Sequence, residues 1–271
     1  MSTKIVPRRS EERGHADHGW LHTFHSFSFA SYADGSHEQF GCLRVINEDR
    51  VEAHTGFGAH PHREFEIFSY VVDGEISHHD SMGNEEILKR GDVQMTSAGT
   101  GIRHSEHAHG GNQVHFLQIW AMPYQRGLKP QYYNRTFTDE AKTNKLATIV
   151  APATAPGVTD TREGSGPTPI HAQLYMHASI ISSATTITHT FPKPANASSS
   201  ATKAYIHVIQ KSGYNPGPAK GGKVTVSADG QEVVLSEGDG AYISSEVGKE
   251  LKIENVGDRV VEFVLFDVDA A

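Results

Sequence analysis

The chain has little that would place it in an oxidising compartment or in a membrane. Its 271 residues include one cysteine, so an internal disulfide is excluded, and Cys42 is expected to be a small buried residue of a strand. No apolar run approaches the roughly 20 residues that a membrane-spanning helix requires. The basic amino terminus is followed by no apolar core, so a secretory signal is not expected. We expect a cytoplasmic protein, or a nuclear one if its source is eukaryotic.

Positive charge is also scarce. The chain has 24 Lys and Arg against 32 Asp and Glu, for a formal net charge of −8. Nucleic-acid binding draws on Lys and Arg that neutralise phosphates, and no long basic run is present. Direct binding to nucleic acid is therefore not expected, whereas protein partners are compatible with this charge. The 26 glycines favour a turn-rich β architecture.

Histidine, in contrast, is abundant, and two short motifs contain it at i, i+2 spacing: His60-Pro61-His62 and His104-Ser105-Glu106. In a strand this spacing places both side chains on one face of the sheet. Turn signals at Asp73-Gly74, Met82-Gly83-Asn84 and Arg90-Gly91-Asp92 divide the intervening sequence into short strands, as in an antiparallel barrel. A small barrel gathers inward-facing side chains, so the two motifs are predicted to converge.

Three imidazoles and one carboxylate suit a divalent transition metal. Around a dication they leave a net charge near plus one, which favours an anionic oxygen ligand at an open position. The alternative is that these are solvated loop histidines. His78 and His79 are adjacent, so they face opposite sides of a strand and cannot chelate together. In the later strand, either the face with His115 or the face with Gln118 and Trp120 lines the interior, and the sequence leaves this open.

The sequence resembles the pirin family of bicupins, and within it the bacterial pirin-like quercetin 2,3-dioxygenases. The resemblance covers most of the first 135 residues, and the last hundred match loosely. Two features differ from the general cupin pattern and agree with this subfamily: His54 replaces a glycine, and Ser97-Ala98 stands where a proline is usual. The matching segments are Glu12–Ala16, His18–Leu21, Phe27–Ala30, Leu43–Asn47, Gly56–Glu66, Asp80–Asn84, Ser97–Glu106 and Gln118–Pro123.

The resemblance implies an all-β fold of two tandem cupin barrels, which are double-stranded β-helices of the jelly-roll type. We expect a metal-binding amino-terminal domain at residues 1–150, a linker at 151–169, and a degenerate barrel at 170–271. Gly238-Asp239 stands in the second half where Gly91-Asp92 stands in the first. The second half has no HxH or HxE motif, so we expect no metal there.

The resemblance also implies one metal ion held by His60, His62, His104 and Glu106. Iron(II) is the expected ion, with copper, manganese, nickel, cobalt and zinc as alternatives. The general cupin pattern would use Glu66 instead of Glu106, and spacing alone does not exclude it. We expect Glu66 to have a structural role beside the ligands.

The activity implied is oxidative ring cleavage of a flavonol such as quercetin by dioxygen, with release of carbon monoxide. Glu106 would be the catalytic residue, as general base for the substrate hydroxyl. The alternative is a pirin-like, metal-dependent redox sensor that acts as a transcriptional co-regulator through protein partners. A third alternative is a metal-free binder of a sugar or another small ligand.

Overall fold

The computed structural model describes residues 2–193 and 200–269, and most of them lie in β-strands. Two compact units can be separated. Unit 2 combines Gly14–Phe137 with Val150–Ala172, and unit 1 combines the segment that ends at Arg13, Thr138–Ile149 and the segment that begins at Gln173. The α-helix α1 (Asp139–Lys142) is a single turn. None of the helices in the described part of the chain has the length and hydropathy of a membrane span.

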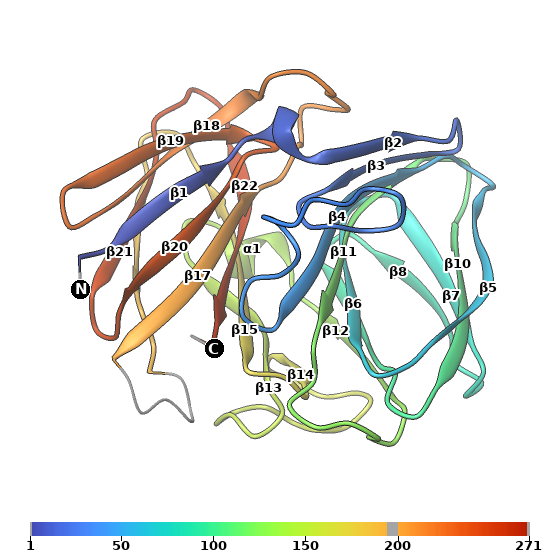
Figure 1. The fold of residues 1–271 in the computed structure, drawn as a ribbon. Coiled ribbons are helices and arrows are strands. Elements are labelled where there is room, and N and C mark those ends of the chain that lie inside the picture. Colours follow the sequence, from blue (N-terminus) through green and yellow to red (C-terminus); the bar gives the residue numbers. More distant parts are fainter. Residues whose placement is uncertain (1, 194–199, 270–271) are drawn as a thin grey trace. The chain divides into compact units, whose positions relative to one another are not determined.

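Unit 2 consists of two sheets (Figure 1). The larger sheet has the order β12-β9-β6-β11-β4-β3-β2, and the smaller has the order β5-β10-β7-β8. A buried apolar cluster with residues of both sheets, among them Val71, Ile76 and Phe116, forms the core between them. The strands are β2 (Gly14–Asp17), β3 (Leu21–His25), β4 (Leu43–Val51), β5 (Gly56–His62), β6 (Glu66–Asp73), β7 (Glu75–Asp80), β8 (Glu85–Lys89), β9 (Asp92–Ser97), β10 (Ile102–Ala108), β11 (Val114–Ala121) and β12 (Gln131–Thr136).

The three predicted turns are confirmed. They connect β6 to β7, β7 to β8 and β8 to β9. In each, a glycine has a positive φ, of 73° at Gly74, 86° at Gly83 and 85° at Gly91. This left-handed conformation costs glycine little, because it has no Cβ. Local turn chemistry therefore fixes how the strands between the two histidine motifs are folded together.

Unit 1 repeats this arrangement. Its sheets have the orders β1-β20-β17-β22-β15 and β16-β21-β18-β19. The strands are β1 (Lys4–Arg8), β15 (Leu174–Ile181), β16 (Thr186–Thr190), β17 (Ala201–Val208), β18 (Lys220–Ala228), β19 (Gln231–Glu237), β20 (Gly240–Glu246), β21 (Glu250–Asn255) and β22 (Val261–Val268).

The correspondence extends to the turn before the ninth and twentieth strands. Asp92 Oδ2 accepts a hydrogen bond from the backbone N–H of Lys89 at 2.9 Å, and Asp239 Oδ2 accepts one from Ser236 at 3.0 Å. Each carboxylate thus closes a four-residue turn in which the residue before the aspartate is a glycine with positive φ. The predicted all-β fold of two barrels is confirmed.

The boundaries of the two units differ from those of the predicted domains. Strand β1 belongs to unit 1, where Ile5 pairs with Ile243 of β20. Residues 138–149 also belong to unit 1, whereas 150–172, which contain the whole predicted linker, belong to unit 2. There β13 (Ala147–Pro152) pairs in parallel with β14 (Thr168–Ile170) through Val150 and Thr168.

Arg135 explains why the predicted linker is part of unit 2. Its side chain is 4% exposed, and its guanidinium donates hydrogen bonds to the carbonyl oxygens of Asn134, Thr159, Thr161 and Arg162 at 2.7–3.0 Å. One strand residue thus satisfies several carbonyls of a loop that has little apolar surface of its own. The composition of the loop cannot show this contact, because its anchor lies outside the loop.

Replacing Arg135 by Met should detach this loop. We expect the free energy of unfolding to fall by about 2–4 kcal/mol, since several hydrogen bonds to a charged group are lost. Urea unfolding and limited trypsin proteolysis at Arg162 measure the two effects. Arg126→Met, which changes an exposed arginine, is the control. Unchanged proteolysis in Arg135→Met would show that the loop is held by other contacts.

Candidate metal centre

The two histidine motifs lie on neighbouring strands. Strands β5 and β10 pair antiparallel, with His60 opposite His104 and His62 opposite Ile102. Along β10, Ile102, His104, Glu106 and Ala108 are buried while the residues between them are more exposed. The period of two in a strand therefore turns His104 and Glu106 to the same inner face.

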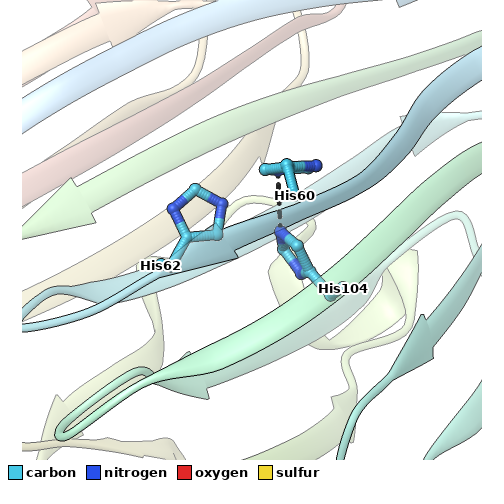
Figure 2. A group of neighbouring side chains, drawn as sticks. All are labelled: His60, His62 and His104. Atoms are coloured by element: carbon cyan, nitrogen blue, oxygen red, sulfur yellow. Dashed lines mark hydrogen bonds between the residues drawn. The ribbon is translucent and has the colours of Figure 1, made fainter.

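The three imidazoles form a compact group (Figure 2). The ring centroids of His60, His62 and His104 are 4.7–4.8 Å apart in all three pairs. The Nε2 atoms of His60 and His104 are 3.2 Å apart. His60 Nδ1 lies 2.7 Å from the carbonyl oxygen of Gly58. Because that oxygen only accepts, Nδ1 carries the proton and Nε2 of neutral His60 presents a lone pair.

The side chains fit a metal ion. One ligand atom from each of the three histidines lies within 4.8 Å of the others. His104 Nδ1 is buried and has no hydrogen-bond partner, which is uncommon for a buried polar atom. Ring nitrogens directed at one another, with a lone pair on at least one, are the donor set that a divalent transition ion uses.

Burial keeps His62 and His104 neutral. The pKa of His62 is lowered to about 4, chiefly by burial and also by the nearby His104 and His60, against an opposing effect of Glu106. The pKa of His104 is also lowered, chiefly by burial. Neutral imidazole is the form that binds a metal. The group is therefore ready to take up a cation at neutral pH without first losing protons.

Glu106 is held by two glutamines. Its Oε1 accepts a hydrogen bond from Gln94 Nε2, and its Oε2 accepts one from Gln118 Nε2 at 3.1 Å. Tyr132 in turn donates to Gln94 Oε1 at 3.3 Å. Glu106 is 2% exposed. Its carboxylate groups with His78 and His104 as a second set of potential ligands, and not directly with His60 and His62.

His78 is a residue of this centre that the sequence analysis missed. It is fully buried, its ring centroid is 5.3 Å from that of His104, and it stacks on Tyr132 at 4.8 Å. Its Nε2 lies 3.2 Å from Asp80 Oδ2. Strand parity was the available signal: Ile76, a core residue, and His78 are both buried on β7.

Glu66 belongs to neither group of potential ligands, and both of its carboxylate oxygens accept a hydrogen bond. Its Oε1 accepts a hydrogen bond from Ser97 Oγ at 2.6 Å, and its Oε2 accepts one from the backbone N–H of His171 at 3.0 Å. The His171 side chain also faces this carboxylate, with Nδ1 3.4 Å from Oε2, and this interaction raises the pKa of His171. These contacts fasten residues 150–172 to the body of unit 2 and favour a structural role for Glu66.

An aromatic wall borders the imidazoles. The ring of Trp120 is 5.0 Å from that of His62, 5.2 Å from Phe65 and 5.5 Å from Phe29. Trp120 and Gln118 have the same parity on β11, so the face with these two residues lines the site. His115, on the opposite face, pairs with Glu48 at 3.0 Å. The indole Nε1 of Trp120 is buried and has no hydrogen-bond partner.

Comparison with known proteins identifies similar sequences and structures. Residues 7–121 match the family model described as Pirin. A quercetin 2,3-dioxygenase of Escherichia coli K12 is 51% identical over 134 residues, which are 49% of this chain and 58% of that protein. This chain thus matches little more than half the length of that relative. A pirin-like protein of Caulobacter vibrioides is 42% identical over 141 residues, 52% of this chain and 61% of that protein.

Two solved structures extend the similarity over nearly the whole chain. The crystal structure of YhhW from Escherichia coli has a TM-score of 0.80 at 32% identity and covers 99% of both chains. The structure of the bacterial pirin YhhW in complex with nickel(II) has a TM-score of 0.79 at 32% identity, over 99% of this chain and 100% of that one.

The neutral state of His62 predicts a pH dependence of stability without metal. The unfolded chain binds a proton at His62 near its ordinary pKa of about 6.5, whereas the folded chain does so only near 4. The contribution of neutral His62 to the free energy of unfolding is therefore fully present above pH 6.5 and is lost as the pH falls toward 4. We expect a loss of about 1–2 kcal/mol between pH 7 and pH 5, allowing for partial exposure.

Urea unfolding of metal-free protein at the two pH values measures this loss. His62→Gln, which cannot be protonated, should show a shallower decline. Equal declines in the variant and the unmodified chain would show that protonation of His62 is not the cause of the decline. The exposed His79 provides the matched control as His79→Gln.

Proposed function

Because the chain belongs to the pirin family, we propose that it is a metal-dependent dioxygenase that cleaves a flavonol such as quercetin. Both atoms of dioxygen enter the product, and one ring carbon leaves as carbon monoxide. The observation that carries the proposal is the compact group of three imidazoles next to a carboxylate and an aromatic wall. The names of the relatives support the substrate class. We place the reaction in the cytoplasm, since the single cysteine forms no internal disulfide.

His60, His62 and His104 would hold the metal, with Glu106 as the fourth ligand. We propose iron(II) as the ion, and the donor set also suits nickel, the ion in the YhhW complex. When bound, the ion supplies a Lewis acid and a template for the substrate oxygens. Gly58 and the buried setting of His104 orient the imidazoles before any ion arrives.

Glu106 would accept the proton of the flavonol 3-hydroxyl and return it to the ring-opened product. A general base must lie within hydrogen-bond reach of that proton. The two glutamine N–H groups on Glu106 restrict its rotation. Gln94 is itself fixed by Tyr132, so a chain of two buried residues orients the carboxylate.

The aromatic wall would position the substrate rings. Phe29, Phe65 and Trp120 are each partly exposed, so their faces are accessible to a planar ligand. Aromatic rings stack in offset or edge-on arrangements. The unpartnered indole N–H of Trp120 would donate to a flavonol oxygen. Apolar walls with a few directed polar groups are the usual composition of a small-molecule site.

Removing the proposed base should abolish turnover without preventing folding. In Glu106→Gln the side chain keeps its shape, and rotation of the neighbouring amides preserves hydrogen bonding. We expect kcat with quercetin in air to fall at least about 100-fold. The decay of the flavonol absorbance measures it in protein loaded with iron(II). Glu66→Gln is the control, with an expected effect on stability and little on kcat.

If Glu106→Gln and the unmodified chain oxidise quercetin equally fast, Glu106 is not the base. If iron-loaded, folded protein leaves quercetin unchanged while binding one ion, the dioxygenase proposal is wrong. Carbon monoxide in the headspace distinguishes ring cleavage from ordinary autoxidation.

Truncating the aromatic wall should weaken substrate binding. For Trp120→Ala we expect KM for quercetin to rise about tenfold, as stacking on an aromatic side chain contributes roughly 1–3 kcal/mol. Trp120→Phe should recover part of this loss but not the contribution of the indole N–H. Steady-state kinetics of the three proteins test the prediction, and an unchanged KM in Trp120→Ala would place the substrate elsewhere.

A further inference from the structure

A second group of ligand-type side chains lies in unit 1. His177 of β15, His189 of β16 and Asp267 of β22 each bring one ligand atom within 4.8 Å of the others. Their side chains are 9%, 8% and 3% exposed. The sequence analysis expects no metal here because neither histidine belongs to an HxH motif. The three residues come from three strands, so their spacing along the chain does not reveal the group.

Strand parity and register explain how the group forms. On β16, Ile187 and His189 are buried, while the threonines around them are exposed. On β22, Asp267 pairs with Tyr175 of β15, and His177 lies two residues further along the same face. This diagonal position is within reach of a side chain on the neighbouring strand. Since β16 belongs to the other sheet of unit 1, His189 reaches the pair from a separate sheet.

The carboxylate of Asp267 contacts both imidazoles. Its Oδ2 lies 2.9 Å from His177 Nε2, and its Oδ1 lies 2.9 Å from His189 Nε2. Burial acts to raise the pKa of Asp267, but the hydrogen bonds from the two histidines outweigh it and the pKa is lowered. An ionised carboxylate only accepts, so each Nε2 carries a proton in this arrangement.

The surroundings of His177 allow this proton to move to the other ring nitrogen. His177 Nδ1 lies 2.9 Å from Thr148 Oγ1. A hydroxyl both donates and accepts, so it suits either tautomer. With the proton on Nδ1, the Nε2 lone pair faces Asp267 and is available to a cation. A hydrogen bond on the far nitrogen is typical of histidines that bind metals.

There is also space for a further ligand. A cavity of about 20 Å³ is lined by Asp267, Tyr175 and Thr202, among others. This is about the volume that one water molecule requires. The cavity borders Asp267, so a water molecule there could serve as a further ligand beside the carboxylate.

We propose that His177, His189 and Asp267 form a second binding site, for a divalent transition-metal ion such as Zn²⁺. Two imidazoles and a carboxylate are an established ligand set for zinc and for non-haem iron. At metal–ligand distances of about 2.1 Å, tetrahedral ligands are about 3.4 Å apart, so the present 2.9 Å contacts need only small movements. Apolar side chains could fill the same space without burying the charge of Asp267. Binding of a cation would give His177, His189 and Asp267 a function at this position.

The test removes the first centre and counts ions at the second. The 271-residue His60→Ala/His62→Ala/His104→Ala protein, which lacks ligands of both groups in unit 2, is stripped with a chelator, dialysed against Zn²⁺, and examined by elemental analysis and calorimetry. We expect one bound equivalent. Adding His189→Gln or Asp267→Asn should weaken binding at least about 100-fold, because even losing the hydrogen-bond partner of a ligand costs roughly 10–100-fold. His207→Gln, a buried histidine of the same unit outside the group, should leave binding unchanged.

Circular dichroism verifies that each variant is folded. The proposal is overturned if the folded triple variant binds no zinc, or binds it equally well with His189→Gln added. Should the added substitutions unfold the protein, crystals of the unmodified chain soaked in Zn²⁺ decide the question. An anomalous peak between His177 and His189 supports the site, and its absence where the first centre is occupied refutes it. Neither result depends on whether quercetin is a substrate.

Discussion

The pairing of β5 with β10 is the constraint on which the metal centre of unit 2 depends. It sets His60 directly opposite His104. Between this pair and the next, in which Glu106 faces Phe57, β5 has one more residue than β10. This bulge lets Phe57 return to the interior and pack on the apolar cluster. The carbonyl of Gly58, within the bulge, fixes the tautomer of His60. One irregularity thus serves both the core and the site.

The interior of unit 2 has an apolar end and a polar end. Along a strand, the inward-facing side chains change from apolar to polar within two residues. On β11, Phe116 belongs to the apolar cluster and Gln118 holds Glu106; on β7, Ile76 belongs to it and His78 does not. Each large apolar side chain that is fully buried contributes about 1.5–3 kcal/mol. Unpaired buried polar groups such as His104 Nδ1 and Trp120 Nε1 act in the opposite direction, at about 1–3 kcal/mol each. The apolar end offsets the cost of the site.

The sequence predicted features set by local spacing or by turn chemistry. The HxH and HxE motifs gave the inward faces of β5 and β10, and the glycine turns gave the strand order between them. Gln94 and His78 were not predicted, and the choice between the faces with Gln118 and His115 was left open, because these orientations depend on the register of neighbouring strands. The assignment of β1 to unit 1 was also not predicted, since Ile5 pairs with Ile243, which lies near the other end of the sequence. Contacts of this kind have no local signal.

The second unit shows what the strand pair requires when only one potential ligand, His189, lies on it. Strands β16 and β21 take the positions of β5 and β10, and there His189 faces Leu251 while Ile187 faces Ile253. Leu251, Ile253 and Ile187 all belong to the apolar core of unit 1. Aliphatic side chains therefore satisfy this pairing and stabilise the same topology. Since the fold does not demand histidines on β5 and β10, the three imidazoles of unit 2 are retained at a cost in stability, and their chemistry is the reason to keep them.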